Sequence, residues 1–201
     1  MTWLQEKNHG ILNVVLNNKV VTVINQRLSE IYSQMQNCKD CELSELPVNK
    51  IKPWGKFGNK KILIVSQNPS FYRKKFGDIP YFNGYTVYGG LNVIMDTKLL
   101  DDVYITNLIK CSFEFNKVPC NVDEIIRKCS KWFKKEIEII QPEKIICLGT
   151  LACKYFNVCS KKRIFIFPKI EVVGFEHPSY VSRFERDVID EYISRIIAEI
   201  Q

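Results

Sequence analysis

Three short apolar runs mark the middle of the chain. They are KKILIV (Lys60–Val65), VYITNLI (Val103–Ile109) and KIICLG (Lys144–Gly149). Continuous apolar runs of this length are typical of strands buried on both faces of a parallel sheet. RIFIF and EVVGF, closer to the C-terminus, predict two further strands.

Segments with helical periodicity separate these strands. In QRLSEIYSQMQNC, apolar residues recur at helical spacing, and CNVDEIIRKCSKWFKKEIEII predicts an amphipathic basic helix. TLACKYF and DVIDEYISRIIAEI predict two more helices. Strands that alternate with helices indicate an α/β fold, with a mostly parallel sheet and helices on both of its faces.

Polar turns follow the predicted strands. SQNPS comes after the first, Thr106-Asn107 lies within the second, and EHPS follows the last. In open α/β sheets, ligands bind at the carboxyl ends of the strands. The long segment from Phe71 to Gly90 is rich in glycine and aromatic residues, and loops of this length are usually functional. We therefore expect a binding site at this edge of the sheet.

The composition excludes several classes of protein. The chain has 201 residues, of which 46% are apolar and 25% charged, as in an ordinary soluble domain rather than a disordered, collagenous or disulfide-stapled one. No apolar run is long enough to span a bilayer, and the N-terminus lacks the pattern of a signal peptide. We therefore expect a reducing cytoplasm. The net charge of +7 is compatible with a polyanionic partner.

Eight cysteines in a reducing compartment suggest core residues, metal ligands or nucleophiles. Cys38 and Cys41 form a CxxC pair at the end of a predicted helix, whereas Cys111 follows the second strand and Cys129 lies in the basic helix. Four thiolates suit either zinc or an iron–sulfur cluster. Cys120 is an alternative to Cys111 as the third ligand.

Two other cysteines, Cys147 and Cys153, lie in apolar strand and helix contexts and are expected in the core.

The order of motifs adds a resemblance. The chain reads CKDC, SQNPS, GDIPYFNG, VYITNLIKC, NKVP, CSKW, LGTLA and HPSYVSR. This resembles the uracil-DNA glycosylase superfamily, and among its branches the family 4 enzymes that carry a [4Fe-4S] cluster. The resemblance implies a three-layer α/β/α sandwich around a four-stranded, mostly parallel sheet. It also implies a monomer that flips uracil, or a related deaminated base, out of DNA and hydrolyses its N-glycosidic bond, leaving an abasic site.

The same resemblance implies the cluster ligands and the domain organisation. The ligands would be Cys38, Cys41, Cys111 and Cys129. Residues 26–201 would form the glycosylase-like domain that contains this four-cysteine site. Residues 1–25 would be an N-terminal extension without a clear role.

Roles at the active site follow from the motifs. The resemblance implies that His177 donates a hydrogen bond to the uracil oxygen on which negative charge accumulates, and that Asn107 reads the edge of the base. Tyr81 would stack on the flipped base, with Phe82 as the alternative one position along. Asn116 in NKVP matches a family position near the site.

DNA contacts are implied for the remainder of HPSYVSR. Pro178 and Ser179 would turn the backbone against a phosphate. The residues from Tyr180 to Arg183 would form a loop that probes the minor groove and fills the vacated stack.

One motif departs from the family pattern. Family 4 enzymes usually have a Gly-Glu-x-Pro-Gly turn, but here Gln67 takes the glutamate position and no carboxylate remains in SQNPS. Asn68 resembles the residue that positions water in other branches, and Asp78 is a possible substitute base. Loss of general base assistance costs about 10²- to 10⁴-fold in rate. We therefore expect a slower enzyme or an altered base preference.

Two alternatives stay open at this stage. The first is a non-catalytic DNA-binding relative that keeps the fold and the cluster. The second is a cysteine-rich redox or zinc protein with no role on nucleic acid, although this gives HPSYVSR and YITN no purpose.

Overall fold

The computed structural model describes residues 3–45, 61–69, 103–113, 119–158, 162–166 and 169–201, and the side chains of the first helix from Val20 onward. Its centre is a five-stranded sheet with the order β2-β1-β3-β5-β4. The strands are β1 (Ile62–Ser66), β2 (Val103–Asn107), β3 (Lys144–Leu148), β4 (Arg163–Ile166) and β5 (Ile170–Phe175). All five lie where the apolar runs predict strands.

Four of these strands are parallel, and β4 pairs with β5 in the antiparallel direction. The parallel set agrees with the four-stranded sheet that the resemblance implies. The antiparallel edge strand is an addition, and its direction has a simple cause. Only a few residues separate β4 from β5, and a parallel pairing needs a crossover of a dozen or more.

Helices surround the sheet. Within the described residues they are α1 (Trp3–Gln36), α4 (Val122–Ile140), α5 (Thr150–Tyr155), α6 (Pro178–Phe184) and α7 (Ile189–Ile200), with the short 3-10 helices η1 (Glu42–Glu45) and η3 (Arg186–Val188). No helix in the described ranges combines the length and the apolar character that crossing a bilayer would require.

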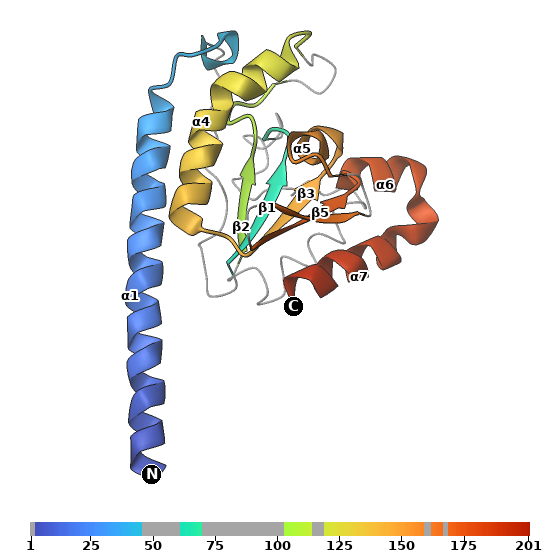
Figure 1. The fold of residues 1–201 in the computed structure, drawn as a ribbon. Coiled ribbons are helices and arrows are strands. Elements are labelled where there is room, and N and C mark those ends of the chain that lie inside the picture. Colours follow the sequence, from blue (N-terminus) through green and yellow to red (C-terminus); the bar gives the residue numbers. More distant parts are fainter. Residues whose placement is uncertain (1–2, 46–60, 70–102, 114–118, 159–161, 167–168) are drawn as a thin grey trace.

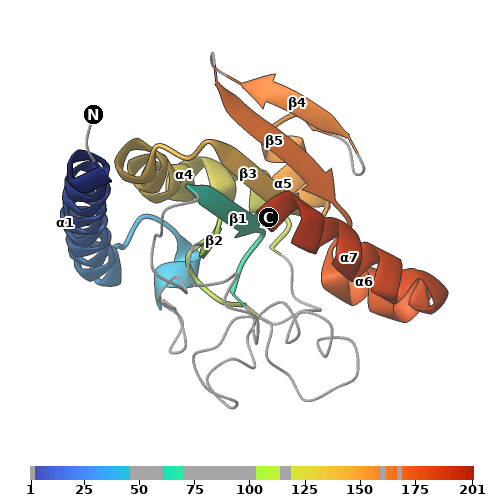
Figure 2. The same ribbon diagram turned by 90° about the horizontal axis from the view of Figure 1, so that it is seen from below.

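The sheet is buried on both faces, which makes three layers. Strand side chains alternate in direction, so Leu63 and Val65 join one apolar cluster with α4 and α5, and Ile62 and Ile64 join another with α6 and α7. Figures 1 and 2 show α4 on one side of the sheet and α7 on the other. The predicted three-layer α/β/α architecture is therefore confirmed.

Helix α1 packs only by its C-terminal part. Its buried side chains Leu28, Ile31 and Met35 lie against the core and α4, whereas Val20 and Val23 are more than half exposed. Figure 1 shows the N-terminal part of α1 extending beyond the rest of the fold. The expected boundary between an extension (residues 1–25) and the domain (residues 26–201) falls inside α1, which runs from Trp3 to Gln36 without interruption.

Candidate functional site

The carboxyl ends of the parallel strands gather the predicted site residues at one edge of the sheet. Ser66 ends β1 and Asn107 ends β2, and these two residues are partners in the parallel register. Ser66 Oγ donates a hydrogen bond of 2.8 Å to Asn107 Oδ1. On the far side of β3, Phe175 ends β5 and leads directly to His177.

His177 is the N-cap of α6. Its Nδ1 accepts a hydrogen bond from the backbone N–H of Ser179 at 3.2 Å and lies 2.6 Å from the Ser179 hydroxyl oxygen. A nitrogen that accepts a hydrogen bond carries no proton, so the neutral ring bears its proton on Nε2. Burial, helped by the nearby charge of Arg183, lowers the pKa of His177 to about 4. Near neutral pH, His177 is therefore an uncharged donor with a fixed tautomer.

Gly149 allows the imidazole to lie close to the end of β3. Its φ is +91°, in the region that favours glycine, and its N–H bonds the carbonyl of Phe175 at 2.9 Å. A Cβ at this position would lie 3.0 Å from the Cβ of His177. The glycine of KIICLG therefore makes room for the histidine.

The SQNPS turn is held against the end of β2. The carbonyl of Ser66 accepts from the N–H of Leu108 at 2.9 Å, and that of Gln67 accepts from Ile109 at 2.8 Å. Asn68 Nδ2 donates to the carbonyl of Pro69 at 2.9 Å. Both predicted residues of this turn, Gln67 and Asn68, are partly buried next to the strand ends.

The HPSYVSR segment differs from expectation in its backbone. Tyr180 to Arg183 were predicted to form a loop, but they belong to helix α6. Pro178 at the start of the helix has a suitable φ, and the His177 side chain caps the exposed N–H of Ser179, so the motif begins a helix.

Helix α6 also brings an aromatic residue that the motif does not include. Phe184 is 72% exposed, and its ring centre lies 5.1 Å from that of Tyr180, one helical turn away. Tyr180 and Phe184 are four residues apart, the spacing that places two side chains next to each other on a helix, so a prediction of helix for this segment would have paired them.

Several predicted residues lie outside the described part of the chain. Tyr81 and its alternative Phe82, Asn116 and Asp78 all belong to this group.

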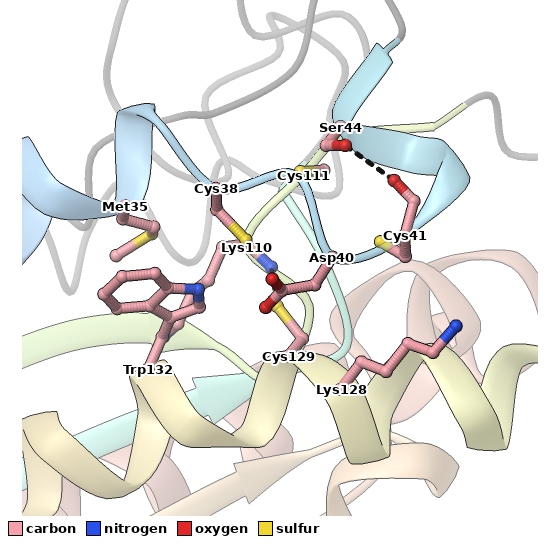
Figure 3. A pocket seen from close by; sticks show the side chains of 10 residues that line it. All are labelled: Met35, Cys38, Asp40, Cys41, Ser44, Lys110, Cys111, Lys128, Cys129 and Trp132. Carbon is pink, nitrogen blue, oxygen red and sulfur yellow. Dashed lines mark hydrogen bonds between the residues drawn. The ribbon is translucent and has the colours of Figure 1, made fainter.

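The four predicted cluster ligands lie around one pocket. Cys38 follows the end of α1, Cys41 precedes η1, Cys111 follows β2 and Cys129 lies on α4, and all four line the same cavity (Figure 3). Cys120, the alternative ligand, is exposed and is not among the residues that line it.

The remaining described cysteines lie elsewhere. Cys147 and Cys153 are buried in the main core, as predicted.

The chemistry of this pocket fits a cluster of several irons. Burial, reinforced by the neighbouring thiols of Cys41 and Cys38, raises the pKa of Cys129 to about 11, although the backbone N–H of Lys110 donates to its sulfur at 3.3 Å. A bound cationic metal would favour the thiolate form of Cys129, which burial alone disfavours. Among the described residues, no three His, Cys, Asp or Glu side chains are placed to share a single metal ion. In a [4Fe-4S] cluster each thiolate binds its own iron, so the ligands need not converge on one point.

Trp132 gives a second indication. Its side chain lines the pocket, it is 6% exposed, and its buried indole N–H has no hydrogen-bond partner in the part of the chain that the structure describes. Figure 3 shows the indole nitrogen on the edge of the ring that faces the centre of the pocket. Buried donors are rarely left unpaired. A sulfur-rich group in this pocket would supply the missing acceptor.

A buried ion pair beside the pocket was not predicted. Lys110 and Glu136 are 3% and 1% exposed, with Lys110 Nζ 2.6 Å from Glu136 Oε2, and the Thr106 hydroxyl bonds both side chains. The pair joins the segment that follows β2, which also carries Cys111, to α4, which carries Cys129. The packing of α4 against the end of β2 brings these charges together, and no local pattern in the sequence signals it.

Comparisons with known proteins agree with this geometry. Residues 53–201 match the Uracil DNA glycosylase superfamily. The chain is 25% identical over 176 residues to a type-4 uracil-DNA glycosylase of Archaeoglobus fulgidus, covering 78% of this chain and 83% of that protein. It is 30% identical over 132 residues to a type-4 uracil-DNA glycosylase of Sulfurisphaera tokodaii, covering 64% of this chain and 57% of that protein.

A solved structure shares the fold. It is that of SMUG2 from Pedobacter heparinus, with a TM-score of 0.52 at 12% identity, covering 86% of this chain and 96% of the other. The resemblance inferred from the motifs is confirmed, and the chain belongs to the uracil DNA glycosylase superfamily.

Proposed function

We propose that this protein is a monofunctional DNA glycosylase. It flips uracil, or a related deaminated base, out of DNA and hydrolyses its N-glycosidic bond, leaving an abasic site. Its membership of the superfamily and its similarity to proteins named type-4 uracil-DNA glycosylase support this function. The observation that carries the proposal is the neutral His177 at the edge of the sheet, whose Nδ1 is occupied and whose Nε2–H is the donor.

Such a donor meets the main chemical demand of the reaction. As the glycosidic bond breaks, negative charge develops on the departing base, and a positioned donor in a dry site stabilises it. A neutral imidazole already bears the proton on the required nitrogen. Because it does not have to be protonated first, the donor is available throughout the physiological pH range.

Asn107 supplies the other contact with the base. Its strand, β2, is separated from β5 by β1 and β3. With about 4.8 Å between neighbouring strands, the ends of β2 and β5 lie about 14 Å apart. That distance leaves room for a base between Asn107 and His177. An amide both donates and accepts, so Asn107 pairs with the carbonyl and ring N–H of uracil and mismatches the amine of cytosine.

The remaining contacts complete the proposed site. Asn68, with Gln67 beside it, positions the attacking water, Tyr81 stacks on the base, and Asn116 lies near it. The DNA backbone and minor groove are contacted by Pro178, Ser179, Tyr180 and Arg183. Of this last group, Tyr180 and Arg183 are exposed on α6, as such a role requires.

A [4Fe-4S] cluster is the proposed cofactor, held by Cys38, Cys41, Cys111 and Cys129. With a thiolate on each iron, such a cluster has no open position for hydrolysis and supplies structural cross-linking. The four cysteines would then tie α1 and η1 to β2 and α4. We further propose that residues 26–201 act as a monomeric domain on DNA in the cytoplasm.

The test is single-turnover base release, followed by alkaline cleavage of the abasic site. The substrates are matched single- and double-stranded oligonucleotides that contain uracil, hypoxanthine, xanthine or thymine. His177→Asn keeps a residue that caps helices well but removes the imidazole donor. We expect release of uracil or another deaminated base by the wild type, and a loss of about 10²- to 10³-fold in the variant. Intact DNA binding without any release would instead identify a non-catalytic relative.

A further inference from the structure

We propose that Ser66 is a positioning residue for base recognition, acting through Asn107. Its hydroxyl holds the Asn107 amide in one orientation, and this orientation selects bases with a carbonyl next to a ring N–H. The inference rests on the proposed function and names the residue that sets the specificity of the same site.

The geometry leaves little freedom to either side chain. Ser66 is 1% exposed, and its carbonyl accepts from the N–H of Leu108, so its backbone is fixed against the residue that follows Asn107. The two residues are partners in the register of β1 and β2, and Ser66 Oγ donates to Asn107 Oδ1 at 2.8 Å. Asn107 Oδ1 is therefore turned toward β1.

The other half of the amide is available. With Oδ1 held by Ser66, the Nδ2 group is left for another acceptor, because it has no hydrogen-bond partner among the described residues. Oδ1 keeps one lone pair for a second donor, because a carbonyl oxygen accepts two hydrogen bonds. Asn107 thus presents a donor next to an acceptor.

This pattern has a defined complement. A carbonyl oxygen accepts from Nδ2, and the adjacent ring N–H donates to Oδ1. Uracil, hypoxanthine and xanthine all carry this edge, which deamination creates, whereas cytosine carries an amine and an unprotonated ring nitrogen. An amide rotated by 180° would suit cytosine instead.

Ser66 opposes that rotation. In the rotated amide, Nδ2 would donate to Ser66 Oγ instead, and the hydroxyl proton, which now bonds Oδ1, would lose that acceptor. At a position that is 1% exposed, water does not replace the lost bond. A buried hydrogen bond of this kind changes an equilibrium by about 2- to 12-fold. Removing the hydroxyl should lower the preference for uracil over cytosine by about that factor.

The experiment compares Ser66→Ala, which lacks the hydroxyl, with Ser66→Thr, which keeps it and suits a strand. Single-turnover rates are measured on duplexes with uracil or cytosine at one position. Binding is measured in parallel on duplexes with the non-hydrolysable 2′-fluoro-deoxyuridine or 2′-fluoro-deoxycytidine. Urea unfolding establishes that each variant is folded. We expect the uracil-to-cytosine ratio to fall about 2- to 12-fold in Ser66→Ala and to stay near the wild-type value in Ser66→Thr.

The two readouts separate the two proposals. If the wild type releases uracil and the ratio in Ser66→Ala is unchanged, the role of Ser66 is overturned and the glycosylase stands. If the wild type releases no base but binds the fluorinated uridine in preference, and Ser66→Ala loses that preference, Ser66 keeps its role and the hydrolytic function fails. If neither protein distinguishes the two bases in either assay, both proposals fail.

Discussion

The neutral state of His177 makes the stability of the protein depend on pH in a predictable way. The pKa of this residue is about 4 in the folded protein, because burial and the charge of Arg183 disfavour the imidazolium. In the unfolded chain, a histidine has a pKa of about 6.5. As pH falls below this value, the unfolded chain binds a proton that the folded protein does not. Stability is therefore unaffected above about pH 7 and declines between about pH 6.5 and pH 4.

The size of the effect follows from the two pKa values. At pH 4.5 the difference in proton binding lowers the free energy of unfolding by about 2.5 kcal/mol relative to pH 7.5. A domain of this size is typically stable by about 5–15 kcal/mol, so the loss is a large fraction of the total.

The assay is urea unfolding of the wild type and His177→Asn at pH 7.5 and pH 4.5. The variant keeps a capping side chain but has no imidazole at this position, so its own loss of stability measures all other titrating groups. We expect the wild type to lose about 2.5 kcal/mol more than the variant. An NMR titration provides a second measurement, in which the imidazole signal absent from the variant should titrate near pH 4.

Equal losses in the two proteins, with that imidazole signal titrating near pH 6.5, would refute the reasoning. The ring would then be accessible to protons, and the uncharged donor assigned to His177 would no longer hold at mildly acidic pH.

Two further predictions concern the cysteine pocket and its support. Glu136→Gln should lower the free energy of unfolding, measured in urea, by about 3–5 kcal/mol, because the Lys110 charge stays buried without its partner. Lys110→Met combined with Glu136→Leu should recover most of the lost stability. A Glu136→Gln variant as stable as the wild type would contradict the role of the ion pair. Trp132→Phe should lower the reduction potential of the proposed [4Fe-4S] cluster by about 40 mV in an EPR-monitored titration. Loss of an N–H donor worth about 1 kcal/mol disfavours the more negative state of the cluster. Met35→Leu, which changes the packing of the same pocket but no donor, should leave the potential unchanged, and equal shifts in both variants would exclude the hydrogen bond.

Much of this architecture can be predicted from the order of residues along the chain. The five strands are short runs whose apolar character is needed wherever a strand is covered on both faces, so local composition is enough to find them. The helices α4 and α7 follow for a similar reason, because one apolar side must face the sheet. The cysteines and the HPSYVSR motif, through the resemblance to the uracil-DNA glycosylase superfamily, indicate the four candidate ligands and His177 from the sequence.

Other features depend on contacts between residues far apart in the sequence. The Ser66–Asn107 hydrogen bond exists because two strands 41 residues apart pair in one register, and Lys110 meets Glu136 only when α4 covers β2. Helix α6 replaces an expected loop because the His177 side chain is turned onto the N–H of Ser179. Periodicity and motifs specify which face of an element is buried, but not which polar groups meet once it is buried. Those partners are chosen by strand register and helix packing, because a polar group that loses water must find its hydrogen bonds within the folded chain.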